Sequence, residues 1–352
     1  MLKFVCFILL AYECEAIRLV RHEGGNLIYA LANGKLVSVE DVPAGLKCDC
    51  FCPACGEQLV AKKGQKMTHH FAHKAGTNCA FGYQTSLHLL AKDILANARR
   101  MVIPELYLRP DKPWLRDHLI SPAREILIDE VDVEQNHGSI IPDVAVYAGG
   151  KKFFVEIYVT HAVDEEKLSK LKQAGISTIE IDLSKADRYI QAADLSEVLL
   201  GNSENKKWIF NTQVDKYYQA FLQVSEKRRI FHKGHVDYTD FCPRKLHWVN
   251  GKPCASQFDD CFNCDYQFEV GDDYVLCMGR SLVTSIDDLK KPRKERRACR
   301  TSPVNFKTMA DAKLWICPDC GYPLHRVEGK QGSFIGCSNY PWCNFTMPDN
   351  SK

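Results

Sequence analysis

The sequence predicts an α/β protein in which a mixed sheet is flanked by helices, with small cysteine-rich modules on both sides of the sheet. Two observations support this prediction. Residues 101–200 alternate between strand-like runs and a helix-like segment, and the chain holds 17 cysteines in 352 residues, many of them in C-x-x-C pairs. Close thiol pairs beside Gly and Pro, in a chain long enough to bury a core, indicate metal sites in a reducing compartment rather than disulfides.

Composition excludes several classes of protein. The chain is 45% hydrophobic and 26% charged, which is ordinary for a soluble globular protein and excludes a disordered chain or a collagen. Its 46 basic and 44 acidic residues nearly cancel, so net charge alone predicts no partner. Because no apolar run reaches the ~18 residues that span a bilayer, we expect a cytoplasmic protein without a membrane partner.

The N-terminal third should contain a β meander, a zinc finger and a helix. Residues 1–14 hold a short apolar core like that of a signal peptide, but acidic residues follow it and no cleavage pattern does, so a first strand or a misassigned start codon fits better. Over 1–47, short apolar runs separated by Gly-Gly and Asn-Gly turns predict the meander. Residues 48–82 are rich in Cys and His, and leucine spacing predicts a helix over 84–100.

The central part, residues 83–200, should hold the mixed sheet. Alternation predicts strands at 125–133, 143–147 and 153–159, and a Gly-Gly turn joins the last two into a hairpin. A helix is expected over 163–174 and a further strand over 178–183. A helix that crosses from one strand to the next is the usual route to a parallel pair.

The C-terminal part divides into a module and a ribbon joined by a linker. Residues 201–284 combine one amphipathic helix, expected over 205–229, with a middle cysteine cluster. Residues 285–312 are expected to be a basic linker, and 313–352 a ribbon. The linker contains a run of seven basic residues and one acid, which would bind DNA phosphates without sequence preference: Lys290, Lys291, Arg293, Lys294, Arg296, Arg297 and Arg300.

Three cysteine clusters have the spacing of structural zinc sites. Two thiolate pairs, or one thiolate pair with two imidazoles, match the tetrahedral coordination of Zn²⁺, so we expect about three zinc ions. The C-terminal set is Cys317, Cys320, Cys337 and Cys343. The N-terminal set is Cys52, Cys55, His70 and His73, with Cys79 as the first alternative and Cys48, Cys50 and His69 as further competitors.

The middle cluster leaves its ligand set open. Cys261 and Cys264 form a clear C-x-x-C pair, and the two remaining ligands must come from Cys242, Cys254 and Cys277. We favour Cys242 and Cys277, because the residues around each predict either a strand or a Pro-containing zinc knuckle.

Two carboxylates in the predicted hairpin suggest a site for a hard divalent cation. Asp143 and Glu156 are about equally distant from the Gly-Gly turn, so antiparallel pairing places them opposite each other. A Glu in a strand as apolar as this one is costly to bury unless it is paired or binds a metal. Oxygen ligands with open positions suit Mg²⁺ or Mn²⁺.

The same arrangement occurs in the PD-(D/E)xK nuclease core, where the metal lowers the pKa of an attacking water. A lysine is expected there two residues after the Glu, but this chain has Tyr158. The missing cation could come from Lys167, or from Lys92 together with His88. Thr160 and His161, which end the Glu strand, could position water or phosphate.

Roughly residues 25–185 resemble the competence protein CoiA-like family. The matching words are Cys52-Pro-Ala-Cys55, His70-Phe-Ala-His73, Ser86-Leu-His88 with Lys92, Pro142-Asp143-Val144, and Glu156-Ile157 followed by Thr160-His161. This resemblance implies a zinc knuckle fused to a restriction-endonuclease-like α/β domain that acts on foreign DNA. The resemblance also implies that Tyr158 weighs less against a nuclease, because members of the family often lack the lysine two residues after the Glu.

Residues 332–343 resemble the C-terminal zinc ribbon of type I topoisomerases, which presents aromatic side chains to single-stranded DNA. The candidates here are Phe334, Tyr340, Trp342 and Phe345, with Arg326 and Lys330 for the backbone. Some of these aromatics could instead cover the small zinc core.

We therefore predict a metal-dependent DNA nuclease that acts on foreign or single-stranded DNA, with Asp143 and Glu156 holding Mg²⁺ or Mn²⁺. The alternative is a catalytically inactive DNA-binding or processing factor of transformation or defence. A zinc-rich scaffold for protein partners is the third hypothesis.

Overall fold

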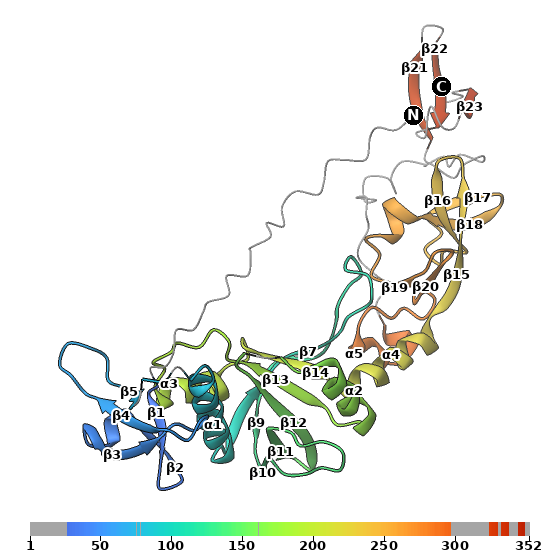
Figure 1. Cartoon of the computed structure of the whole chain (residues 1–352). Coiled ribbons are helices and arrows are strands. Elements are labelled where there is room, and N and C mark those ends of the chain that lie inside the picture. Colours follow the sequence, from blue (N-terminus) through green and yellow to red (C-terminus); the bar gives the residue numbers. More distant parts are fainter. Residues whose placement is uncertain are drawn as a thin grey trace. The chain divides into compact units, whose positions relative to one another are not determined.

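The computed structural model describes residues 27–74, 76–77, 79–160, 162–296, 324–329, 332–337 and 344–348 (Figure 1). The chain forms two compact units. The first comprises residues 1–101, 126–170 and 179–206, and the second comprises residues 102–125, 171–178 and 207–352. Within the described residues, no helix has the length and apolar character needed to cross a membrane.

The first unit begins with one antiparallel sheet of five strands in the order β2-β1-β3-β4-β5. The predicted meander and zinc finger are therefore a single sheet, because β3 runs across the expected boundary at residue 47. The predicted Asn33-Gly34 turn joins the first two strands, with positive φ at both residues, as a tight hairpin requires. The elements are β1 Tyr29–Ala32, β2 Lys35–Ser38, η1 Val39–Asp41, β3 Gly45–Phe51, β4 Gln58–Lys62 and β5 His70–His73.

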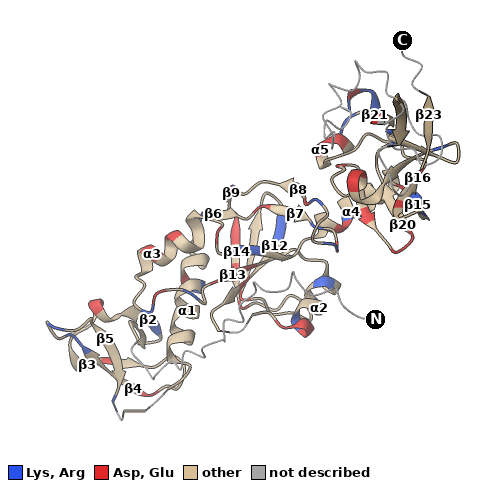
Figure 2. Cartoon of the chain, turned by 90° about the horizontal axis from the view of Figure 1, so that it is seen from above, with Lys and Arg blue, Asp and Glu red and all other residues tan. Residues whose placement is uncertain are grey.

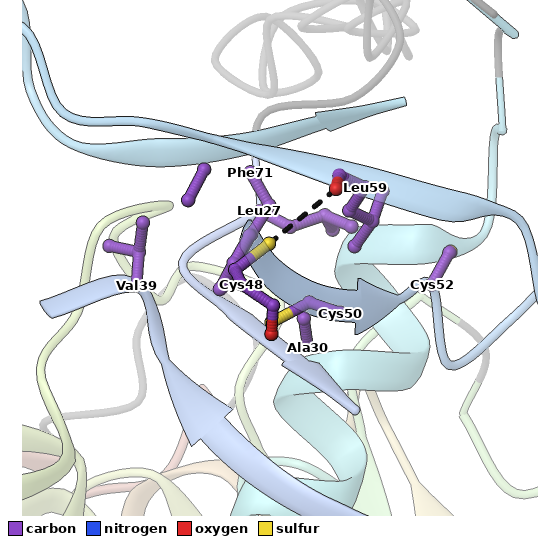
Figure 3. Close-up of a cluster of buried hydrophobic side chains, with 9 residues drawn as sticks. Leu27, Ala30, Val39, Cys48, Cys50, Cys52, Leu59 and Phe71 are labelled. Atoms are coloured by element: carbon purple, nitrogen blue, oxygen red, sulfur yellow. Dashed lines mark hydrogen bonds between the residues drawn. The ribbon is translucent and has the colours of Figure 1, made fainter. Parts of the chain in front are cut away.

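A small hydrophobic core packs against this sheet and contains Cys48, Cys50 and Cys52 (Figure 3). Cys48 and Cys50 alternate inward along β3 and are both buried. The Cys48 thiol donates to the carbonyl of Leu59 at 3.6 Å, and the Cys50 thiol donates to the carbonyl of Cys48 at 3.2 Å. Both are thus core thiols rather than competitors for zinc.

Helix α1, Gly82–Ala96, connects the two sheets of the first unit. It buries the apolar positions that predicted it, Leu87, Leu90, Ala91 and Leu95. It packs against β1 and β2 of the first sheet and against β10 and β11 of the second. Two short helical segments near its side complete the unit, α3 Ala192–Ser196 and η2 Glu197–Gly201.

The second sheet belongs to the α/β part of the chain and has the strand order β10-β11-β12-β13-β14. The predicted hairpin and the strand that follows the predicted helix are present. The bounds are β10 Glu130–Val133, β11 Val144–Ala148, β12 Lys151–Tyr158, α2 Glu165–Ala174, β13 Thr178–Asp182 and β14 Lys206–Phe210. Helix α2 buries one residue, Leu171, and carries charges of both signs (Figure 2).

The prediction of a single strand over 125–133 is wrong. Residues Arg124–Leu127 form β9, which pairs with β6, Arg100–Ile103, whereas β10 joins the mixed sheet. The chain changes partner between them, because Ile128 N donates to Arg99 O while Asp129 N donates to Tyr147 O. Alternation along a sequence cannot reveal such a change of partner.

The prediction of one helix over 205–229 is also wrong. The segment is strand β14, helix α4 (Thr212–Val224) and the start of strand β15. Asn211 caps the helix by accepting a hydrogen bond from Gln213 N at 3.0 Å, and this is a preferred N-cap residue. Before the cap, the aromatic and β-branched run at 208–210 favours a strand.

The second unit contains a six-stranded sheet in the order β17-β18-β16-β15-β20-β19. A core between this sheet and α4 gathers Leu108, Phe221, Phe268, Met278, Val283 and Ile286. A two-stranded sheet of β7 and β8 lies in the same unit. The bounds are β7 Leu106–Leu108, β8 His118–Ser121, β15 Glu226–Lys233, β16 Val236–Asp240, β17 His247–Val249, β18 Lys252–Ser256, η3 Gln257–Cys261, β19 Gln267–Val270 and β20 Tyr274–Cys277.

The predicted basic linker begins with ordered structure, α5 Ile286–Leu289 and η4 Arg293–Glu295. The C-terminal ribbon has three antiparallel strands, β21 Leu324–Gly329, β22 Gly332–Cys337 and β23 Thr346–Pro348. Several predicted residues lie outside the described part of the chain: residues 1–26, His161, Arg297, Arg300, Cys317, Cys320, Lys330, Tyr340, Trp342 and Cys343.

Candidate functional site

Asp143 and Glu156 face each other across the hairpin of the mixed sheet. Val144 pairs with Val155, so the next pair outward in this register joins Asp143 to Glu156. Both carboxylates line a cavity of about 200 Å³. The sequence therefore determined the register of the pair, because the Gly149-Gly150 turn leaves equal numbers of residues on its two sides.

Asp143 is surrounded by donors. His88 Nε2 lies 3.0 Å from Oδ2 and Lys92 Nζ lies 3.3 Å from Oδ1, and both come from one face of α1, where residues four apart are neighbours. The backbone N–H of Ile157 donates to Oδ2 at 2.9 Å. Burial alone would raise the pKa of Asp143, but these donors outweigh it and hold the pKa well below its usual range. Asp143 is thus ionised at neutral pH.

Glu156 has the opposite environment. Its side chain is 3% exposed, and the Lys167 ammonium donates to Oε2 at 2.5 Å. Burial and the nearby Asp143 carboxylate raise the pKa of Glu156 to about 7, although Lys167 opposes the shift. Its Oε1 is buried and has no hydrogen-bond partner among the described residues. An oxygen in this state is expensive to bury, and a metal ion would satisfy it.

Tyr158 and Lys167 share the cavity with the carboxylates. Residues two apart in a strand lie on the same face, so Tyr158 occupies the position where a PD-(D/E)xK lysine is expected. Lys167 supplies an ammonium there from the first turn of α2. Asp164 fixes that turn by accepting a hydrogen bond from Lys167 N at 2.7 Å.

Asp164 also lines the cavity, and sequence analysis missed it. The signal that could have found it is an acidic residue just before a predicted helix, the usual position of a cap. Gln84, one turn before His88 on α1, is a second missed residue of the lining.

Two other candidates lie outside the cavity. Lys92 is buried and bridges Asp143 and Glu134, with its Nζ 2.7 Å from Glu134 Oε1. It therefore orients Asp143 without itself lining the cavity. Thr160 is exposed and does not line the cavity.

A second site gathers Cys52, Cys55, His73 and Cys79. Among the described residues, this is the only group of three or more His, Cys, Asp or Glu side chains whose ligand atoms all lie within 4.8 Å of one another. The Cys52 and Cys79 sulfurs are 3.9 Å apart, and Cys55 Sγ is 3.3 Å from His73 Nε2. Tetrahedral zinc with its usual bond lengths needs about 3.8 Å between two sulfurs and about 3.5 Å between sulfur and nitrogen. The donor set therefore fits Zn²⁺.

The structure replaces one predicted ligand of this site, because Cys79 takes the position expected for His70. His70 and His73 lie three apart in strand β5, so they point to opposite faces. The His70 imidazole instead contacts the carbonyl of Thr68 through Nδ1 at 2.8 Å. His69 is occupied as well, at 2.8 Å from a Glu40 carboxylate oxygen.

The middle cysteines lie in the second unit. Cys242, Cys261, Cys264 and Cys277 line one small cavity. Cys254 lies apart from it in a core with Tyr238 and Val249.

The ribbon divides its aromatics between two roles. Phe345 packs against a core of Leu324, Ile335 and Cys337. Phe334 neighbours Ile335 in β22 and so lies on the other face of the strand, where it is partly exposed.

The described part of the basic run is partly engaged. Arg293 and Arg296 donate to the carbonyls of Arg280 and Ser281. Lys290 pairs with Asp287 at 2.8 Å. Lys294 is exposed in η4.

Comparison with known families matches two segments of the chain. Residues 43–82 match the N-terminal domain of competence protein CoiA. Residues 315–352 match the topoisomerase DNA-binding C4 zinc finger. The two resemblances noted in the sequence are confirmed over these segments, and the N-terminal match contains all four residues of the Cys₃His site.

Most of the relatives match a short stretch of the chain. A plasmid DNA topoisomerase I of Xylella fastidiosa is 58% identical over 33 residues, which are 9% of this chain and 5% of that protein. An uncharacterized protein of Haemophilus influenzae is 53% identical over 32 residues, 9% of this chain and 18% of the relative. DNA topoisomerase 1 of Methanothermobacter thermautotrophicus is 24% identical over 259 residues, 68% of this chain and 34% of the relative.

The chain thus spans only a small part of the first relatives it matches. No solved structure is significantly similar to it. The comparisons identify a chain that joins a CoiA-type N-terminal domain to a topoisomerase-type zinc ribbon.

Proposed function

We propose that the chain is a Mg²⁺- or Mn²⁺-dependent DNA nuclease whose active site is the cavity around Asp143 and Glu156. The observation that carries this proposal is a facing pair of carboxylates, Glu156 buried and Asp143 half-buried, at a cavity of about 200 Å³ that can admit a phosphate. The strand order, with a hairpin followed by a helix and a further strand, is consistent with a restriction-endonuclease-like domain.

The residues fit a hard divalent ion. Asp143 is held ionised by His88 and Lys92, and Glu156 Oε1 is buried with no hydrogen-bond partner in the described part of the chain. Asp143 and Glu156 would hold the ion, leaving positions open for water and phosphate. When bound, such an ion lowers the pKa of a water and polarises the phosphoryl group.

The chain's own groups would do the remaining work. Lys167 holds the Glu156 carboxylate in place, and because its side chain is 34% exposed, its ammonium can also donate to a phosphate oxygen at the cavity. A positive group aimed at a phosphoryl oxygen stabilises the charge that develops there. His88, which also lines the cavity, holds Asp143 in its orientation.

DNA is the proposed substrate because of the two matched segments. The family model of the ribbon is described as a DNA-binding zinc finger of topoisomerases, and the N-terminal model comes from a competence protein. We propose that the ribbon and the basic run hold foreign or single-stranded DNA for cleavage in the first unit.

Cleavage of labelled single- and double-stranded DNA with Mg²⁺ or Mn²⁺ tests this proposal. The wild type should cut, whereas Glu156→Gln and Asp143→Asn should bind DNA and lose at least 100-fold in rate. Glu130→Gln, an exposed carboxylate in the same sheet, is the matched control and should cut normally. Equal cleavage by the wild type and Glu156→Gln would refute the proposal.

One observation favours a second function, a DNA-binding factor without catalysis. Lys167 already neutralises Glu156 at 2.5 Å, and Tyr158 stands where the lysine is expected. This alternative predicts that the wild type binds DNA but leaves it intact with either metal, and that Asp143→Ala retains its function in cells.

A further inference from the structure

The second unit contains four cysteines that approach one another from separate elements. Cys242 follows β16, Cys261 ends η3, Cys264 lies in the next turn and Cys277 ends β20. All four side chains line one cavity of about 20 Å³. We infer that Cys242, Cys261, Cys264 and Cys277 bind a structural zinc ion that closes this module.

A donor beside one of the sulfurs suits a thiolate rather than a thiol. Gly279 N donates to Cys277 Sγ at 3.4 Å. A neutral thiol is a weak acceptor. The amide aimed at this sulfur is therefore better satisfied by a thiolate than by a thiol.

Two arginines contribute positive charge at this cavity. Arg244 Nη1 lies 3.9 Å from Cys264 Sγ, and the buried Arg228, which pairs with Glu226, lines the cavity together with Cys277. Zinc with four thiolates carries a net charge of −2, which the Arg244 guanidinium would partly offset. Groups outside the ligand set that contact the ligands tune and orient metal sites in this way.

Strand geometry settles which cysteine is left out. Cys254 and Ala255 are neighbours in β18 and so lie on opposite faces. Ala255 packs with Cys242 and Cys261, whereas Cys254 packs with Tyr238 and Val249. Cys254 is therefore a core thiol, and the ligands are the other four.

A zinc ion also explains how this module is held together. Its cores near the cysteines are small, with three buried residues in each cluster. The larger core of this unit lies against α4, so a metal ion would stabilise the end of the sheet where little apolar surface is buried. No three of these four sulfurs lie within 4.8 Å of one another, so zinc binding requires the cysteine side chains to move inward.

Zinc content of the full chain, measured by native mass spectrometry, tests the inference. Cys264→Ser and Cys277→Ser should each hold one zinc fewer than the wild type. Cys254→Ser, which alters a buried cysteine outside the set, should hold as many as the wild type. An unchanged zinc count in Cys264→Ser, or a loss of zinc in Cys254→Ser alone, would overturn the inference.

Alkylation of the wild type gives an answer even if a variant fails to fold. Cys264 and Cys277 are partly exposed, so as free thiols they would react with iodoacetamide. We expect peptide mapping to show both protected until a chelator is added. Rapid alkylation before chelation, or a disulfide between any two of the four, would exclude the zinc site.

Discussion

Two neighbouring carboxylates of this protein have opposite ionisation behaviour, and the cause lies in their immediate surroundings. Asp143 accepts a hydrogen bond from a backbone amide and lies beside the His88 imidazole and the Lys92 ammonium, which together hold its pKa below the usual range. Glu156 is more deeply buried and pairs with Lys167, and burial together with repulsion from Asp143 raises its pKa to about 7. Pairs of carboxylates that titrate apart in this way are common in hydrolytic sites.

The raised pKa of Glu156 predicts a pH-dependent stability. Between its ordinary pKa and about 7, the folded protein keeps a proton that the unfolded chain has released. The free energy of unfolding should therefore fall as pH rises from 5 to 8, relative to Glu156→Gln. Urea unfolding of both proteins in magnesium-free buffer measures this difference. Parallel pH curves for the two proteins would show that Glu156 has an ordinary pKa.

Lys167 should stabilise the protein through Glu156. In Lys167→Met, the buried carboxylate loses its partner, and we expect a loss of about 1–2 kcal/mol, reduced by the partial exposure of the ammonium. A double-mutant cycle with Glu156→Gln isolates the interaction.

Lys170→Met is the matched control for Lys167→Met. Lys170 lies on the same helix and pairs with the exposed Glu166 at 2.7 Å, and such surface pairs contribute less than about 1 kcal/mol. Equal destabilisation by the two substitutions would contradict the role assigned to Lys167.

At the scale of elements, the alternation of a strand decides which residues can bind a common ion. His70 and His73 are three residues apart in β5, so their side chains lie on opposite faces of the strand. Cys79, in the segment that leads into α1, completes the site with His73. Spacing alone favoured His70, because a short His-x-x-His interval fits many metal sites. Only the assignment of those residues to a strand excludes it.

Zinc content should distinguish the two candidate ligands. Cys79→Ser should remove one zinc per chain, because a structural site with three ligands loses most of its affinity. His70→Ala should keep all of the zinc, although its burial makes some loss of stability expected. Atomic emission analysis of the purified proteins measures the metal. Loss of zinc in His70→Ala with retention in Cys79→Ser would reverse the assignment.

The ribbon should bind single-stranded DNA through Phe334. Stacking contributes about 1–3 kcal/mol per base, so Phe334→Ala should weaken binding roughly 10-fold in a fluorescence-anisotropy titration. Phe334→Tyr keeps an aromatic face and should restore affinity. Unchanged binding by Phe334→Ala, with its zinc retained, would place the DNA contact elsewhere.

For the whole molecule, DNA affinity is expected to combine contributions from several modules. The near-neutral chain has a local basic run, but its described part is largely tied to neighbouring carbonyls and carboxylates. The number of basic side chains available to contact phosphates is therefore smaller than the sequence suggests. The salt dependence of DNA binding measures how many of them make such contacts.

The exposed Lys294 gives a direct test. If Lys294 contacts a phosphate, Lys294→Gln should make the plot of log DNA affinity against log salt concentration less steep by about 0.7 for a single strand. Lys290→Gln, which removes a residue already paired with Asp287, should change the slope less. Identical slopes for the wild type and Lys294→Gln would show that η4 does not touch DNA.

Local patterns in the sequence determined the parts of this protein that depend on chain neighbours. The facing carboxylates follow from a symmetric Gly-Gly hairpin, α1 from its leucine spacing, and the two matched segments from short Cys and His motifs. Tertiary structure alone decided the rest: the exchange of His70 for Cys79, the position of Lys167 on Glu156, the exclusion of Cys254 and the division of 205–229 into three elements. The physical reason is that ligation and ion pairing depend on which face a side chain occupies and which distant element meets it, and neither is encoded by spacing along the chain.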